Sequence, residues 1–143
     1  MADRAPPGRH GIYVASRASL AERLAMCRGL RAAGWPICCS WIDEDGPAET
    51  ADFATLWPRI VAEMATAAAL VVYAEPDDLP VRGVLVEVGL ALANGIPVML
   101  VTPGLHLIGR SCQPLGSWIL HPLVQRQPSI EAAFQTVTGR LKP

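Results

Sequence analysis

Short apolar runs alternate with segments of helical periodicity along most of this chain of 143 residues. Runs of this length are typical of buried strands, and they are Gly11–Ala15, Pro36–Ile42, Ala69–Ala74, Pro97–Thr102 and the short Trp118–Leu120. The expected helices are Ser16–Ala33, about Glu49–Ala67, Gly83–Ala93 and Ser129–Leu141. Such alternation predicts an α/β domain with a parallel sheet of about five strands and helices on both faces.

The composition supports one folded domain. Half of the chain (51%) is hydrophobic, 17% is charged, and the net charge is −1, which argues against disorder and against binding to nucleic acids by phosphate neutralisation. We expect residues 1–10 to form a flexible tail and residues 11–143 to form the domain. Pro58 either divides the second expected helix or begins its second half.

No segment predicts a membrane partner or export. The uncharged stretch from Val88 to Gly109 is interrupted by Asn94-Gly95, Pro97 and Pro103-Gly104, which indicate turns. The N-terminal residues lack the apolar core of a signal peptide. The four cysteines follow neither zinc nor disulfide spacing and fit reduced thiols. We therefore expect a cytoplasmic protein.

No cofactor or metal site is expected. The three acids Asp43–Asp45 fit a solvated loop better than a metal site, since no matching ligand motif accompanies them. The chain also lacks the glycine-rich motifs for dinucleotides and nucleoside triphosphates.

Ligands of parallel α/β sheets bind beyond the carboxyl ends of the strands. Here those segments are Ala15–Arg17, Ile42–Gly46, Ala74–Arg82 and Thr102–Gly109. Arg82 beside Gly83 is placed to hold a phosphate at a helix start, or is simply an exposed arginine. Of the four tryptophans, Trp41 is the best placed to stack on a ligand.

Glu87 is the only acid in the apolar segment 84–93. Its position about one turn after Gly83 places it near the positive end of the expected helix, which favours an ionised carboxylate. Such a carboxylate is suited to covalent attack on a sugar carbon. Alternatively, Glu87 caps the helix or pairs with Arg82.

Three sequence blocks resemble the nucleoside 2-deoxyribosyltransferase family, which includes deoxynucleoside 5′-monophosphate N-glycosidases. The blocks are Ile12–Arg17, the Ala-Leu-Val-Val-Tyr run at 69–73, and Gly83-x-x-x-Glu87-x-Gly89-x-Ala91-x-Ala93-x-Gly95-x-Pro97-Val98. Together they cover roughly residues 11–102. The resemblance implies a flavodoxin-like fold and cleavage or transfer at the N-glycosidic bond of a nucleoside or nucleoside monophosphate.

The resemblance also implies residue roles. Glu87 matches the nucleophile that attacks C1′, and Tyr13 matches the tyrosine that positions it. Ser16 and Arg17, following Ala15, lie where relatives approach the sugar or phosphate. The family is typically oligomeric, with neighbouring subunits completing the pocket.

The chain departs from the family at its acids. Relatives often carry an aspartate where this chain has Ala69, and the transferases place an acid where it has Val81. The leaving base needs a proton, and Asp77 and Asp78 either supply it, bind a ribose hydroxyl, or make a solvated turn. Two other functions stay open. One is a non-catalytic nucleotide-binding or oligomeric module, and the other is a TIR-like NAD-cleaving enzyme, which the Glu87 block argues against.

Overall fold

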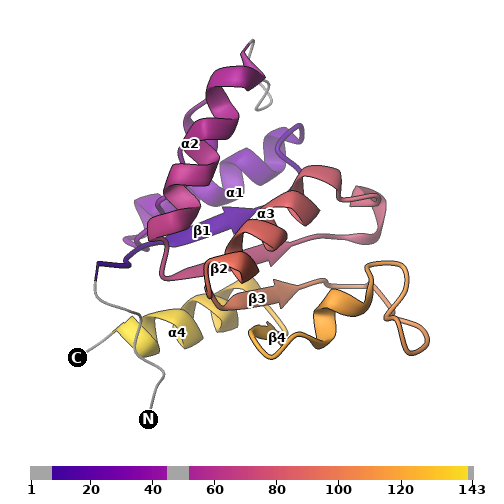
Figure 1. The fold of residues 1–143 in the computed structure, drawn as a ribbon. Coiled ribbons are helices and arrows are strands. Elements are labelled where there is room, and N and C mark those ends of the chain that lie inside the picture. Colours follow the sequence, from indigo (N-terminus) through magenta and orange to yellow (C-terminus); the bar gives the residue numbers. More distant parts are fainter. Residues whose placement is uncertain (1–7, 45–51, 142–143) are drawn as a thin grey trace.

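A computed structural model describes residues 8–44 and 52–141, without the side chains of residues 140 and 141. Its strands are β1 (Ile12–Ala15), β2 (Ala69–Tyr73), β3 (Val98–Val101) and β4 (Val124–Arg126), as Figure 1 shows. Its α-helices are α1 (Ala21–Ala32), α2 (Phe53–Thr66), α3 (Arg82–Ala93) and α4 (Ile130–Leu141). Three short 3-10 helices are η1 (Ser40–Asp43), η2 (Pro76–Asp78) and η3 (Ser117–Leu120).

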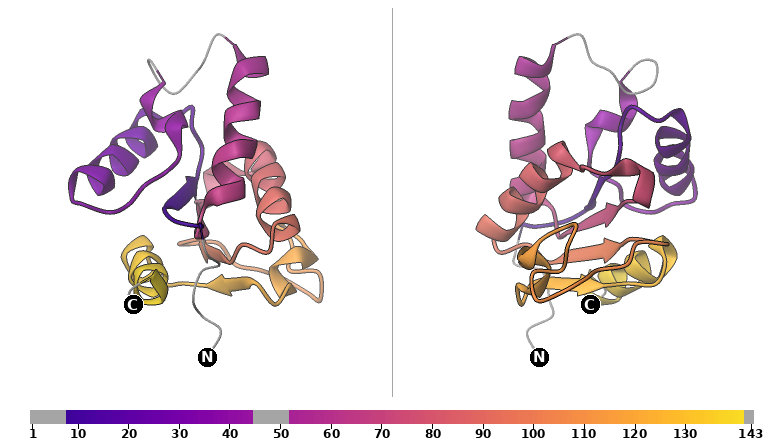
Figure 2. Two further views of the ribbon diagram at one scale, coloured as in Figure 1. Left: turned by 60° about the vertical axis from the view of Figure 1, so that its left-hand side comes forward. Right: turned by 90° about the vertical axis from the view of Figure 1, so that its right-hand side faces the viewer.

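All four strands are parallel and lie in the order β1-β2-β3-β4. Helices α2 and α3 cover one face of the sheet, and α1 and α4 cover the other (Figures 1 and 2). Every residue of β1 and β3 is buried, as expected for strands that are covered on both faces. The predicted flavodoxin-like α/β fold is therefore confirmed, with one strand fewer than expected.

The segment Pro36–Ile42 does not form the predicted second strand. It meets the outer edge of β1 at a single parallel bridge between Ile37 and Ile12 and then turns into η1. Pro36 has no N–H to give to a ladder. Beyond Cys38, the Ser40 amide bonds to a side chain, the Glu63 carboxylate at 3.1 Å. The segment thus lies where a fifth strand would lie without extending the sheet.

The run Trp118–Leu120 was also wrongly predicted as a strand. It forms η3, and the Trp118 indole donates to the Leu115 carbonyl at 3.0 Å, within its own turn. The edge strand β4 follows it and pairs with β3. Its last two residues, Gln125 and Arg126, are polar and exposed. The strand therefore has no apolar run that would predict it from the sequence.

The helices begin and end close to their predicted boundaries, except at the starts of α1 and α2. Helix α2 begins at Phe53 rather than at about Glu49, because the Asp52 side chain caps it by accepting the Thr55 amide. Helix α1 also starts later than predicted. That helix begins at Ala21 because Ser16 and Arg17 instead make contacts across the carboxyl edge of the sheet. Pro58 lies inside a continuous α2 and does not divide it. Ser129, the first residue of the predicted last helix, accepts a hydrogen bond from the Ala132 amide through its hydroxyl and so caps α4.

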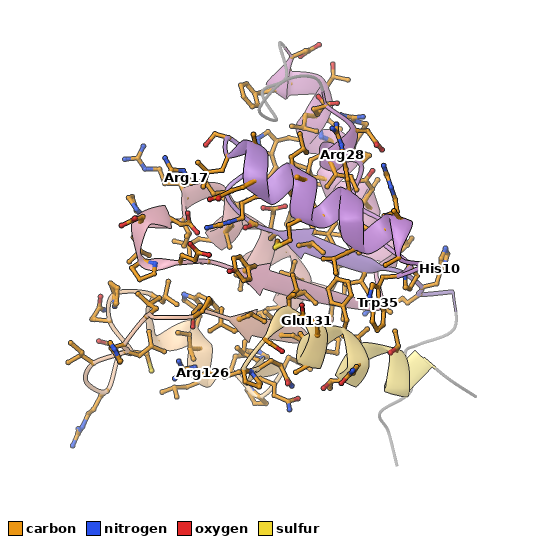
Figure 3. The ribbon with its side chains drawn as sticks, turned by 180° about the vertical axis from the view of Figure 1, so that it is seen from behind. His10, Arg17, Arg28, Trp35, Arg126 and Glu131 are labelled. Atoms are coloured by element: carbon orange, nitrogen blue, oxygen red, sulfur yellow. The ribbon has the colours of Figure 1, made fainter. Side chains whose placement is uncertain are left out.

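The contacts of the last tail residues are described, while residues 1–7 lie outside the described part. Arg9 donates to the Asn94 carbonyl, and the His10 amide donates to the Thr66 carbonyl at 2.9 Å. Seen from behind in Figure 3, His10 lies near Trp35 at the end of the molecule where the strands begin. Among the described residues, no helix is long and apolar enough to cross a membrane.

Candidate active site

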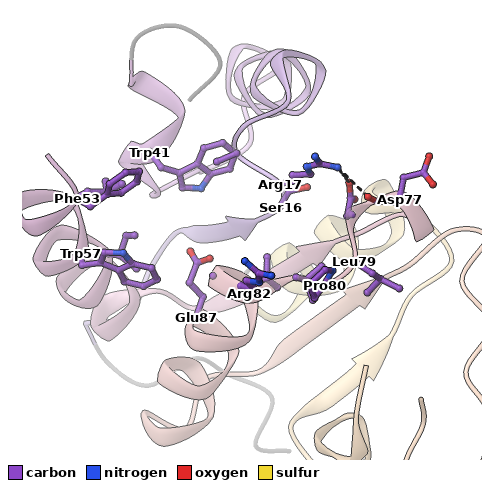
Figure 4. A pocket seen from close by; sticks show the side chains of 17 residues that line it. Ser16, Arg17, Trp41, Phe53, Trp57, Asp77, Leu79, Pro80, Arg82 and Glu87 are labelled. Carbon is purple, nitrogen blue, oxygen red and sulfur yellow. Dashed lines mark hydrogen bonds and ion pairs between the residues drawn. The ribbon is translucent and has the colours of Figure 1, made fainter. Parts of the chain in front are cut away.

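A pocket of about 520 Å³ opens at the carboxyl ends of β1 and β2 (Figure 4). From β1 the chain passes first to Ile37 at the outer edge of the sheet and later returns through α2 to β2 on the other side. In parallel α/β sheets, a crevice forms where the connections after two neighbouring strands run to opposite sides of the sheet, and ligands bind in this crevice. The volume falls within the usual range of roughly 300–1,000 Å³ for small-molecule sites.

Glu87 extends from α3 into the middle of this pocket (Figure 4). It is the sixth residue of the helix and shares the buried face with Val84, Val88 and Ala91. These residues are spaced three and four apart, so the carboxyl group belongs to the stripe that packs toward the sheet. Its residue is only 8% exposed.

Burial raises the pKa of Glu87 to about 7, and the hydroxyl of Tyr13 partly offsets this rise. The sequence interpretation expected the helix terminus to keep the carboxylate ionised, but desolvation outweighs that influence. Glu87 forms no ion pair with Arg82 or any other described residue, so the alternative pairing with Arg82 is not observed. A carboxyl group with a pKa near 7 changes its charge around neutral pH.

Tyr13 lies beneath Glu87 in the fully buried strand β1. Among the described residues, its hydroxyl makes no hydrogen bond of ordinary length and angle. It nevertheless lies close enough to interact with Glu87, because burial first and then the Glu87 carboxylate raise the pKa of Tyr13 far above its usual value. Tyr13 is therefore a neutral phenol beside the candidate nucleophile, as its predicted positioning role requires.

Aromatic side chains form one end of the pocket (Figure 4). They are Trp41 from η1 and Phe53 and Trp57 from α2. The Trp41 indole donates to the Val14 carbonyl at 2.8 Å, which fixes its ring. Trp41 thus faces the pocket as predicted, although from a 3-10 helix. Trp57, one of the four tryptophans that the sequence offers for stacking, also lines the pocket, although the sequence favoured Trp41. Phe53 was not predicted as a site residue, since it fits the apolar pattern of α2.

Two arginine side chains lie on the side of Glu87 away from Phe53 and Trp57, with Arg82 next to Glu87 and Arg17 farther along (Figure 4). Arg17 follows β1 and donates to the Asp77 carbonyl at 3.0 Å, and the exposed Arg82 opens α3 beside Gly83. Both arginines and Gly83 line the pocket, whereas Ala15 is buried at the end of β1 and does not line it. Figure 4 shows Glu87 between the aromatic end and Arg17.

Asp78 is held in a buried network rather than left free in the pocket. Its Oδ2 lies 2.6 Å from Nη1 of Arg23 and accepts the Glu75 amide at 2.7 Å. Arg23 also donates to Ser16 Oγ at 3.0 Å, and Ser16 donates to the Tyr73 carbonyl at 2.7 Å. Asp77 points away from Glu87 (Figure 4). Both aspartates thus line the pocket, but the Asp78 carboxylate is held by Arg23 and the Asp77 side chain is turned away from Glu87.

Arg23 was not identified from the sequence. It is 3% exposed, pairs with Asp78 and with Glu75 at 3.2 Å, and lies over the Tyr73 ring at 4.9 Å. The sequence did indicate that Arg23 would be buried, because it lies four residues before Cys27 and so on the same, buried face of α1. A buried arginine is rare unless paired, and its partners come from β2 and the loop that follows it.

The described residues contain no cluster of three or more potential metal ligands. Asp43 pairs with Arg31 and Glu44 pairs with Arg59, while Asp45 lies outside the described part. No model of a protein family, no curated protein and no solved structure matches this chain.

Proposed function

We propose that this protein cleaves the N-glycosidic bond of a nucleoside or nucleoside 5′-monophosphate, with Glu87 as the nucleophile. Water or a second base then takes the sugar from the glycosyl-enzyme. The observation that carries the proposal is a buried carboxyl group, unpaired with any described cation, halfway along a pocket with an aromatic end and an arginine end.

The order of groups along the pocket matches the order of groups in a nucleotide. Aromatic faces stack on bases, and Arg17 and Arg82 suit an anionic phosphate. A nucleotide bound in this direction carries its C1′ between these two ends, where Glu87 lies. The resemblance in the sequence blocks supports the same assignment, and it also supports a homo-oligomer.

The Tyr13 hydroxyl supports a nucleophilic role for Glu87. A neutral phenol beside the carboxyl group can donate to one of its oxygens and thereby orient the other toward the sugar. No described cation competes for that second oxygen.

The test is release of free base from a panel of nucleosides and their 5′-monophosphates, followed by chromatography. We expect wild-type protein to release base and Glu87→Gln to lose at least about 100-fold in rate, as removal of a group that acts in covalent catalysis should. Glu131→Gln is the matched control, since Glu131 is exposed on α4, away from the pocket.

Two results would contradict the proposal. Unchanged turnover in Glu87→Gln would exclude the nucleophile. Ligand-induced thermal stabilisation without any release of base would instead favour the non-catalytic module.

A further inference from the structure

Among the described residues, the carboxyl groups that line the pocket are Asp77, Asp78 and Glu87. If Glu87 attacks the sugar, the two aspartates are the acids of this described pocket that could give a proton to a neutral leaving base. The Asp78 side chain is 1% exposed, and its Oδ2 is bound by Arg23 and the Glu75 amide. Its Oδ1 makes no hydrogen bond among the described residues, but it is buried and lies 4.0 Å from Nη1 of Arg17. The Asp77 side chain is exposed and points away from Glu87 (Figure 4).

Neither aspartate is therefore placed to protonate a base at C1′. General acid catalysis typically contributes roughly 10²–10⁴-fold to such a reaction. A substrate whose base already carries a positive charge does not need that proton, because the base leaves as a neutral molecule.

We infer that the substrate of this site is an N-glycoside with a cationic base, of the pyridinium or N7-alkylated purine class. This inference rests on the proposed function. A Glu87 oxygen forms a bond to C1′ while the C1′–N bond breaks, and its electron pair neutralises the ring nitrogen. Water then hydrolyses the glycosyl ester, which returns the Glu87 carboxylate, the free sugar and one proton to solvent.

The walls of the pocket favour the same class of base. Trp41, Phe53 and Trp57 present aromatic faces, which attract cations that lie over them. Glu87 adds the opposite charge beside the ring nitrogen. Arg17 lies toward the far end of the pocket, where it suits a phosphate. Arg82 lies next to Glu87, on the side away from Phe53 and Trp57 (Figure 4).

A cationic base also suits the electrostatics of Glu87. A positive charge placed next to a carboxyl group favours its ionised form, and this counteracts the burial that raises the pKa of Glu87. Substrate binding would thus prepare the nucleophile.

Two matched substrate pairs test the inference on the full chain. The first pair is nicotinamide riboside and its neutral 1,4-dihydro form, and the second is 7-methylguanosine and guanosine. Base release is measured by chromatography after subtraction of the uncatalysed rate. We expect the cationic member of each pair to be cleaved at least about 100-fold faster, and Glu87→Gln to lose this cleavage.

Unreactive ligands separate recognition from the intrinsic lability of cationic glycosides. The cation 1-methylnicotinamide should bind more tightly than neutral nicotinamide, measured by tryptophan fluorescence or calorimetry. Trp57→Leu should weaken binding of the cation roughly five- to thirtyfold. Trp57→Phe, which keeps an aromatic face, should retain most of the affinity.

Each outcome has a distinct meaning. Equal cleavage of both members of a pair would overturn the inference and leave the proposed function standing. Cleavage of neither member, together with no base release from the wider panel, would overturn both. Equal binding of the two unreactive ligands would overturn the role of the aromatic end.

Discussion

Glu87 occupies a position on α3 at which the pattern of buried neighbours calls for an apolar side chain. A carboxyl group there is costly when ionised, and this cost is what raises its pKa. The sequence identified the residue because it is the only acid in its segment. The sequence could not predict the raised pKa of Glu87, because this shift depends on how deeply α2 and the sheet bury the carboxyl group.

Replacing Glu87 should change how stability depends on pH. Its pKa is about 7 in the folded chain against an ordinary 4.5, so the folded state binds the proton more tightly. This contribution is fully present below about pH 4.5 and is lost as the pH rises through about 7. Wild-type protein should therefore lose about 2–3 kcal/mol relative to Glu87→Gln between pH 5 and pH 8.

Denaturant unfolding of both proteins at several pH values measures this difference. Glu131→Gln is again the control, because its site is exposed and should show the wild-type dependence. Parallel pH profiles for wild-type protein and Glu87→Gln would contradict the shifted pKa.

Helix α1 contributes to the pocket through a single buried side chain. Arg23 links the start of the loop after β1 to the loop after β2, through Ser16 on one side and Asp78 and Glu75 on the other. The pocket rim thus depends on an element that lies behind the sheet, next to α4 (Figure 3). Arg23 is a positioning residue, since it does not line the pocket.

Removing Arg23 should be strongly destabilising. Arg23→Met leaves the buried Asp78 carboxylate without its closest cation, and breaking such a pair costs about 3–5 kcal/mol. We expect a matching fall in the free energy of unfolding. Arg31→Met on the same helix should leave the denaturation midpoint nearly unchanged, because the Arg31–Asp43 pair is exposed. A mild effect of Arg23→Met would show that the network contributes little.

The elements that the sequence predicted correctly are those with a strong local signal. The run 69–74 contains a strand of the core, and the segment 83–93 keeps a helical periodicity with one buried face. The segments at 36–42 and 118–120 have the same apolar character, but they bury Trp41, Ile42 and Ile119 in 3-10 helices rather than in strands of the sheet. The secondary structure of those two segments depends on their tertiary packing, which cannot be read from a single sequence.

The whole molecule presents large apolar side chains on the helical layer that bears Glu87. Val61 on α2 and Leu85 and Val86 on α3 are 41–52% exposed. Exposed apolar side chains that gather on one layer are typical of interaction surfaces. They support the proposed homo-oligomer.

We expect light scattering after size-exclusion chromatography to give a mass at least twice that of the 15.3 kDa chain. Val86→Glu should shift the protein toward the monomer, because a carboxylate in the contact would be desolvated. Ile108→Glu is the control, since Ile108 is exposed in the loop after β3 rather than on this layer. A monomeric wild-type protein at micromolar concentration would contradict the proposal.

Among the residues that the structure describes, those that line the pocket all lie between positions 16 and 87. The described chain beyond α3 supplies β3, β4 and α4, which support the sheet without lining the pocket. Substitutions in β3, β4 and α4 should therefore act mainly on the stability of the sheet. Substitutions between positions 16 and 87 can change the shape and charge of the pocket as well.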